Sequence, residues 1–217
     1  MARVLLTIGR LQTGGAELRT LDLIRALRQR EMPLEITIYA TSGDPGNLDS
    51  AFREEGAEVI IGRRGVRGLW EVFSLCRRRS FDVLHANASL AAGFYCFVAW
   101  LGGVPHRYSL IRTTGYDERG VVRAFRVAFY RLFLNAFSTR VIGVCNAVRL
   151  LAKTPAKKWL TIYNGIQPPP DVASIHPSGG LEILMLANVR QPKNPLKAVG
   201  IMQALKRACP LQPSCLR

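Results

Sequence analysis

Residues 4–17 read VLLTIGRLQTGGAE, and this stretch decides the fold that we expect. Val4 to Ile8 form a short apolar run, which is typical of a buried strand. Gly14 and Gly15 follow this run, and a segment with helical periodicity begins directly after them. A strand, a glycine turn and a helix N-terminus together present free backbone N–H groups, which can hold an anion or a polar group of a sugar.

The alternation of short apolar runs with longer amphipathic segments continues to residue 166. This alternation is typical of a parallel sheet with helices packed on its faces. The sequence therefore predicts an α/β fold with a doubly wound, Rossmann-like parallel sheet. The expected strands lie near residues 3–9, 34–41, 57–62, 81–87, 107–113, 139–145 and 159–163.

A second strand–turn–helix signal lies near the carboxyl end of the chain. Residues 182–188 form a strand-like run, and a second helical pattern follows them. Residues 167–181 are rich in proline and glycine and predict a linker. We therefore expect a Rossmann-like domain at 1–166 and the first strand and helix of a second one at 182–217. Because residues 209–217 do not read as its next strand, we expect this second domain to be truncated.

The composition predicts a globular chain with anionic partners. The chain has 217 residues, of which 48% are apolar, and a formal charge of +15. A positive field of this size favours phosphates or acidic lipid headgroups. The sequence signatures of RNA- and DNA-binding proteins are missing, so we expect no nucleic acid among the partners.

The cysteines indicate a reducing compartment. Cys76, Cys96 and Cys145 lie inside apolar segments, and the chain shows no secretory signal at its start. We therefore expect a cytoplasmic protein whose cysteines are small buried side chains. No C-x-x-C pair occurs and the three histidines lie far apart, so we expect no zinc site.

Three segments bear on membrane contact. Residues 88–104 are uncharged, but their length is at the lower limit for a span and Pro105 ends them, so they predict a buried helix. Residues 119–137 interleave aromatics with arginines, and such a helix either packs on the sheet or rests on an anionic membrane. In residues 63–79, Trp70 lies between arginines, as in a helix that anchors at a membrane interface. The same segment has apolar residues at helical spacing, including Val66 and Val72, which predict a stripe that packs in the core.

Several strings, in this order and at these spacings, resemble the retaining glycosyltransferases of family 4, which have two Rossmann domains in the GT-B architecture. The strings are Gly14-Gly15-Ala16-Glu17, Asp82-Val83-Leu84-His85-Ala86-Asn87, Gly103-Val104-Pro105, Val144-Cys145-Asn146-Ala147-Val148, Ile162-Tyr163-Asn164-Gly165-Ile166 and Ala187-Asn188-Val189-Arg190-Gln191-Pro192-Lys193-Asn194. The resemblance implies that the amino-terminal domain handles the acceptor. It also implies transfer of a sugar, with retention, from a nucleotide-sugar to a glycan or lipid-linked acceptor.

The resemblance also implies a set of binding residues, a biosynthetic pathway and a cellular location. Arg190 and Lys193 would neutralise the leaving nucleoside diphosphate, and neither a cofactor nor a metal is expected, since no Asp-x-Asp string occurs. The setting would be synthesis of cell-envelope polysaccharide, on the inner face of the membrane. The expected acceptor-binding residues are Gly14, Gly15, Glu17, His85, Asn87, Arg112 and Thr113.

Two departures from the family pattern limit the predicted chemistry. The family often carries a histidine–glycine pair after the fifth strand, where this chain has Arg112-Thr113-Thr114-Gly115, so no catalytic residue is assigned. The family's paired glutamates have no counterpart before residue 217, so we expect weak or no transferase activity.

Two other classes of protein remain open at this stage. A nicotinamide-dependent oxidoreductase also begins with a strand, a glycine turn and a helix, but it needs G-x-G-x-x-G, whereas Gly9 is followed by Gly14 and Gly15. A non-catalytic basic module that binds a membrane or another anion would explain the charge of +15 directly.

For His85, a structural role at the end of its strand is the alternative to a ligand contact.

Overall fold

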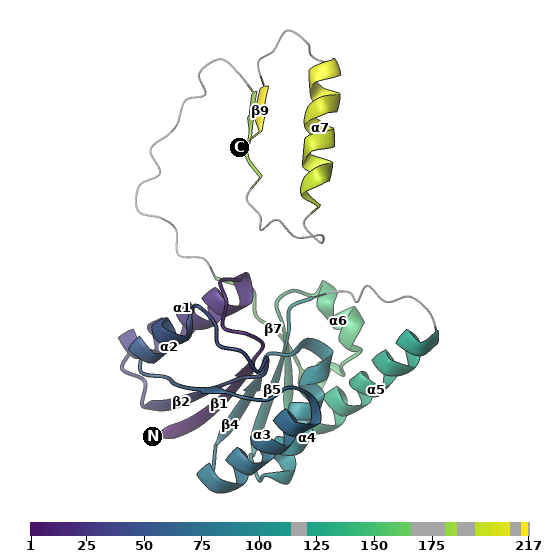
Figure 1. Ribbon diagram of the computed structural model, residues 1–217. Helices are drawn as coiled ribbons and strands as arrows, with labels where there is room; N and C mark the ends of the chain where they lie inside the picture. The colour runs from purple at the N-terminus through teal and green to yellow at the C-terminus, as the bar shows by residue number, and fades with distance from the viewer. Residues whose placement is uncertain (114–120, 166–180, 186–193, 209–213, 217) are drawn as a thin grey trace. The chain divides into compact units, whose positions relative to one another are not determined.

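The computed structural model describes residues 1–113, 121–165, 181–185, 194–208 and 214–216. The chain divides into two compact units, Met1–Gly165 and Ile166–Arg217 (Figure 1). The first unit holds the glycine turn and all seven strands of the larger sheet.

The first unit is built on a parallel sheet with the order β3-β2-β1-β4-β5-β6-β7. This confirms the predicted α/β fold, and every expected strand is present with ends that differ by a few residues. Because the chain builds outward from β1 to β3 and then returns to the other side of β1, the strand order reverses between β1 and β4. Open α/β sheets bind ligands beyond the carboxyl ends of the strands at such a reversal. The strands are β1 (Ala2–Ile8), β2 (Leu34–Ala40), β3 (Glu58–Ile61), β4 (Val83–Ala86), β5 (His106–Ile111), β6 (Arg140–Gly143) and β7 (Trp159–Thr161).

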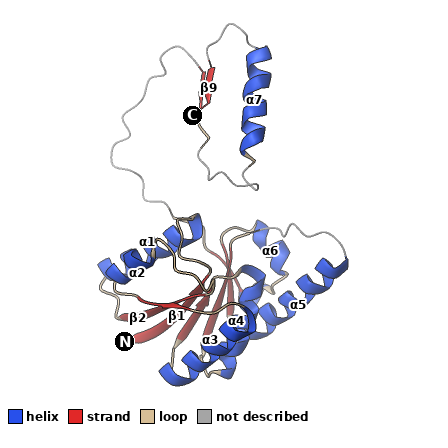
Figure 2. Ribbon diagram, in the orientation of Figure 1, coloured by secondary structure: helices blue, strands red, loops and turns tan. Residues whose placement is uncertain are grey.

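Helices cover both faces of this sheet (Figure 2). Leu6 and Ile8 of β1 pack in a core with α1 and α2, while Leu5 points to the other core, with α3, α4 and α5. This alternation is the period of two that a strand imposes on its side chains. The helices are α1 (Gly15–Gln29), α2 (Asp49–Glu54), α3 (Gly65–Arg79), α4 (Ala92–Leu101), α5 (Val121–Phe137) and α6 (Ala147–Ala152), with short 3₁₀ turns η1 (Ser89–Ala91) and η2 (Ala156–Lys158).

The uncharged segment at residues 88–104 forms η1 and α4, which confirms the predicted buried helix. α4 approaches α5 closely at Gly93, where a Cβ atom would collide with the backbone of Leu134. Cys76 and Cys96 are buried as predicted, whereas Cys145 is only partly buried. Within the described ranges, no helix has both the length and the apolar character needed to cross a bilayer.

Two predictions for the surface of α3 and the carboxyl-terminal region were wrong. Val66 is 82% exposed because α3 begins at Gly65 and its first turn extends past the core, although Val72 is fully buried as expected. In the second unit the strand β8 (Leu181–Ile183) ends five residues before the predicted Asn188, and β9 (Ser214–Leu216) pairs with it in parallel, where no strand was expected. The expected helix is present as α7 (Pro195–Ala208). The predicted linker lies almost entirely outside the described residues.

Candidate functional site

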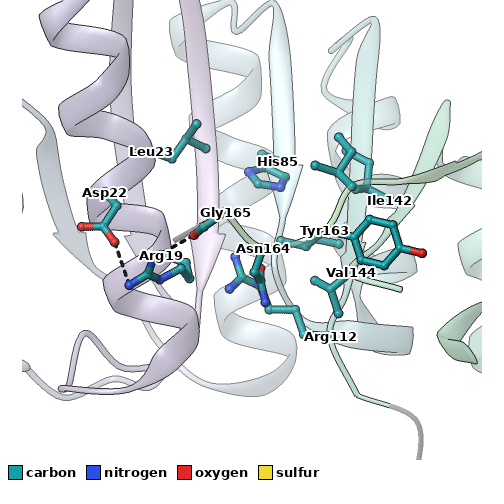
Figure 3. Close-up of a pocket in the computed structure, with 12 residues that line it drawn as sticks. Arg19, Asp22, Leu23, His85, Arg112, Ile142, Val144, Tyr163, Asn164 and Gly165 are labelled. Atoms are coloured by element: carbon teal, nitrogen blue, oxygen red, sulfur yellow. Dashed lines mark hydrogen bonds and ion pairs between the residues drawn. The ribbon is translucent and has the colours of Figure 1, made fainter. Parts of the chain in front are cut away.

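A pocket of about 410 Å³ opens in the first unit at the carboxyl ends of β4 to β7, where α1 forms its other side (Figure 3). Its position is the one expected for a ligand crevice in a doubly wound sheet. Both apolar and polar side chains line it. They are Arg19, Asp22 and Leu23 from α1, His85 from β4, Leu110 and Arg112 from the end of β5, Ile142 and Val144 from the end of β6, and Ile162, Tyr163, Asn164 and Gly165 after β7.

Arg112 is a candidate anion-binding group in this pocket. It follows the last residue of β5, and its Nε is buried without a hydrogen-bond partner in the described part of the chain. Burial lowers the pKa of Arg112, and the Glu17 carboxylate opposes this change. A buried N–H group with no acceptor costs free energy, which a ligand oxygen would recover in a charge-assisted hydrogen bond.

His85 lies in the same pocket as a neutral imidazole at physiological pH. Burial and, to a smaller extent, the positive charge of Arg112 together lower its pKa to about 4. A neutral imidazole has one N–H donor and one nitrogen acceptor. Such a ring can therefore accept a hydrogen bond from a sugar hydroxyl and donate a second one.

Arg19 connects α1 to the segment that follows β7. Its Nη1 donates to the carbonyl oxygen of Gly165 at 2.9 Å, and its Nη2 lies 3.1 Å from the Asp22 carboxylate (Figure 3). These two contacts orient the guanidinium along one side of the pocket. Tyr163 and Asn164, which precede Gly165, are exposed and also line the pocket, so both are available to a ligand.

The glycine turn is held by a loop from the neighbouring strand. The backbone N–H of Thr13 donates to Oδ1 of Asn47 at 3.0 Å, and Nδ2 of Asn47 donates to the Thr13 hydroxyl at 2.8 Å. Gly14 has an extended backbone, with φ of −160°, so its conformation does not itself require glycine. A Cβ on Gly14 would collide with the Glu17 carboxylate, whereas a Cβ on Gly15 would meet no atom within 4 Å. The space beside the helix N-terminus is therefore open at Gly15.

The structure brings together two of the predicted acceptor-binding residues, His85 and Arg112, and places Glu17 close enough to act on the charge of Arg112. Asn87 is partly buried, its backbone N–H donates to the Thr7 carbonyl at 2.8 Å, and it does not line the pocket. Gly14, Gly15 and Thr113 do not line it either. Arg190 and Lys193 lie outside the described residues.

Sequence reasoning missed the contribution of α1 and of the segment after β7. Arg19 and Asp22 carry no motif, because they are spaced like any exposed pair on a helix. Tyr163, Asn164 and Gly165 belong to a string that carries the family resemblance, so that string was the signal that could have placed them in the site.

A match to a family model identifies the family of the chain. The model of the glycosyl transferase 4-like domain matches residues 14–165. The capsular polysaccharide biosynthesis glycosyltransferase CapH of Staphylococcus aureus is 24% identical over 216 residues, which are 95% of this chain and 59% of CapH. The chain thus spans less than two thirds of that relative.

Solved structures show the same fold. Anabaena Alr3699/HepE, in complex with UDP-glucose, superposes with a TM-score of 0.61 and 16% identity over 76% of this chain and 44% of HepE. MurG of Acinetobacter baumannii gives a TM-score of 0.54 and 14% identity over 99% of this chain and 65% of MurG. Because the family model covers most of the chain and includes the whole pocket, the chain belongs to the glycosyl transferase 4-like family and carries the amino-terminal domain of a family 4 glycosyltransferase.

Proposed function

We propose that this chain binds the acceptor in a retaining transfer of a sugar from a nucleotide-sugar to a glycan or lipid-linked acceptor. One observation carries the proposal. The pocket at the carboxyl ends of β4 to β7 joins a guanidinium whose buried Nε has no described hydrogen-bond partner, a neutral imidazole and an apolar wall, in the domain that the family model matches. Such a combination suits a ligand with an anionic group, hydroxyls and an apolar face.

The proposed roles follow from the chemistry of each side chain. Arg112 binds an anionic or strongly electronegative oxygen of the acceptor, since its Nε is buried and still free to donate. His85 hydrogen-bonds a hydroxyl group, and the ring of Tyr163 offers a face against which a sugar ring packs. Arg190 and Lys193 would bind the donor diphosphate and help it depart, without a metal or cofactor.

The relatives suggest the donor and the setting. HepE binds UDP-glucose, and CapH acts in capsular polysaccharide biosynthesis. We therefore propose a UDP-sugar as donor and a growing cell-envelope polysaccharide as the final product. The work would take place in the cytoplasm, at the inner face of the membrane.

A turnover assay with matched variants tests this proposal. The full chain would be incubated with UDP-glucose and other UDP-sugars and with a panel of short glycans and lipid-linked saccharides, and release of UDP would be measured. NMR of the product would report the anomeric configuration. Arg112→Gln and His85→Gln should each reduce turnover by roughly tenfold to a hundredfold, as for loss of one or two hydrogen bonds to the ligand. Arg30→Gln, at an exposed arginine at the far end of α1, is the matched control.

The possible outcomes separate the two classes of function. Turnover that falls in the pocket variants and not in Arg30→Gln supports the transferase. Saccharide binding that the pocket variants abolish, with no UDP released for any donor, supports the non-catalytic binding module instead. Equal activity in all three variants would show that this pocket is not the acceptor site.

A further inference from the structure

A groove of about 360 Å³ lies between α3 and the edge strand β3 of the larger sheet. Its volume is in the range of ligand-binding clefts. Three side chains of α3 line it at intervals of four residues, namely Trp70, Ser74 and Arg78. Residues four apart lie on the same side of a helix, so these three form a single row about 12 Å long. Within the described ranges, the groove shares no lining residue with the pocket at the carboxyl ends of β4 to β7.

Trp70 presents an indole ring at one end of this row. The residue is 67% exposed. The centre of its ring lies 5.2 Å from that of Phe73, which packs against the core, so the protein supports part of the indole while much of it faces solvent. A supported and exposed aromatic ring is a platform on which the apolar face of a sugar ring packs.

The polar groups of the groove include a free cation and a free hydroxyl. In the part of the chain that the structure describes, neither Arg78 nor Ser74 takes part in a side-chain hydrogen bond or an ion pair. The Glu71 carboxylate of the groove is occupied, because it accepts a hydrogen bond from the Tyr39 hydroxyl at 2.6 Å and lies 3.2 Å from Nε of Arg63. The Arg78 guanidinium is therefore not neutralised, and it suits a carboxylate on a ligand.

The edge of the sheet beside the groove disfavours a peptide as its occupant. β3 has only four residues, and it begins with Glu58, which forms an ion pair with Arg79. Short edge strands that carry charged side chains resist the addition of a further strand. A saccharide needs no main-chain pairing. An indole, a hydroxyl and a guanidinium are together able to bind a sugar ring, its hydroxyl groups and a carboxylate on it.

We propose that this groove, which we call the α3 groove, binds an acidic saccharide chain. A sugar ring packs on Trp70, the Ser74 hydroxyl forms a hydrogen bond with a hydroxyl group of the saccharide, and Arg78 binds the carboxylate of a uronic acid unit. The choice of a saccharide over other anions rests on the proposed function, whose product is a polysaccharide. Because the α3 groove is separate from the acceptor pocket, it would hold a product chain on the domain while the pocket stays free.

Isothermal titration calorimetry of the full chain tests this proposal. The probe is tetragalacturonate, which has a carboxylate on each ring, and maltotetraose is the neutral comparison. Tetragalacturonate should bind at least about tenfold more tightly than maltotetraose, because only the acidic saccharide pairs with Arg78. Trp70→Ala and Arg78→Gln should each weaken the binding of tetragalacturonate by roughly tenfold, through loss of the packing surface or of the charge-assisted hydrogen bonds.

Two matched controls lie on the same helix. Val66 is 82% exposed one turn before Trp70, and Arg77 is exposed beside Arg78, but neither side chain lines the groove. Val66→Ala and Arg77→Gln should therefore bind tetragalacturonate as the wild type does. Arg77→Gln removes the same charge as Arg78→Gln, so a difference between these two variants reports the groove and not the overall charge. Thermal unfolding of each variant separates lost binding from lost folding.

The remaining outcomes decide against the α3 groove. Absence of tetragalacturonate binding, or equal binding by wild type and Trp70→Ala, overturns the proposal. An equal loss in Arg77→Gln and Arg78→Gln would show attraction by the overall positive charge alone. Equal affinity for a short polyglutamate peptide would identify an acidic peptide as the occupant.

The acceptor pocket is tested in the same titrations. Loss of tetragalacturonate binding in Arg112→Gln would place the saccharide in the pocket and overturn the proposal. Loss confined to Trp70→Ala and Arg78→Gln supports the α3 groove, even where the transferase assay releases no UDP. The failure of this proposal and the failure of the proposed function are therefore distinguishable.

Discussion

Acid should destabilise the first unit through His85, and the size of the effect follows from its pKa. The folded-state pKa is about 4, against an ordinary value of 6.5. Between these two values the unfolded chain binds a proton that the folded chain does not, so the free energy of unfolding falls as the pH falls through this window. Above pH 6.5 the contribution is constant. Lowering the pH from 7 to 5 should remove about 2 kcal/mol of stability through this residue alone, and about 3 kcal/mol is lost once the pH is below both pKa values.

Urea unfolding at a series of pH values measures this effect. Other groups also titrate in this range, so the informative quantity is the difference between wild type and His85→Gln, which cannot take up the proton. The difference should shrink by about 2 kcal/mol from pH 7 to pH 5. His106→Gln, at an exposed histidine in β5, is the matched control. Parallel pH profiles for wild type and His85→Gln would refute the reasoning, because they would mean that His85 is well solvated in the folded chain.

Three further substitutions test separate parts of the structure. Gly93→Ala should cost about 1–3 kcal/mol in urea unfolding, because its Cβ collides with the Leu134 backbone and forces α4 away from α5. Gly15→Ala should leave the unfolding midpoint almost unchanged, because nothing lies within 4 Å of the new Cβ, and a loss of turnover in this variant would place a ligand at the helix N-terminus. Arg112→Met should not destabilise the fold, since it removes an incompletely paired cation with a buried Nε, and yet it should reduce turnover at least as much as Arg112→Gln does. A drop of several kcal/mol in stability would instead give Arg112 a structural role.

The sheet could be predicted from the sequence because it depends on local patterns. Residues 4–8 are apolar or β-branched, a glycine turn follows, and the next segment repeats at helical spacing, so each element agrees with the fold around it. The site was harder to predict from the sequence, because the pocket combines the ends of several strands with one side of α1. Arg19 lies within reach of Gly165 only after the chain has folded, and no periodicity relates two residues that far apart. β9 was missed for a similar reason, since three residues paired with a distant strand leave almost no local signal.

The arginines of this domain explain why the charge of the chain survives folding. Several of them satisfy backbone carbonyls rather than carboxylates: Arg107 donates to the carbonyls of Val104, Pro105 and Phe137, and Arg131 donates to that of Leu151. A hydrogen bond to a carbonyl fixes the guanidinium without neutralising its charge. The ion pairs that the structure describes lie between residues 3 and 79. The arginines that hold helix ends and strand ends in place through carbonyls therefore keep their positive charge in the folded domain.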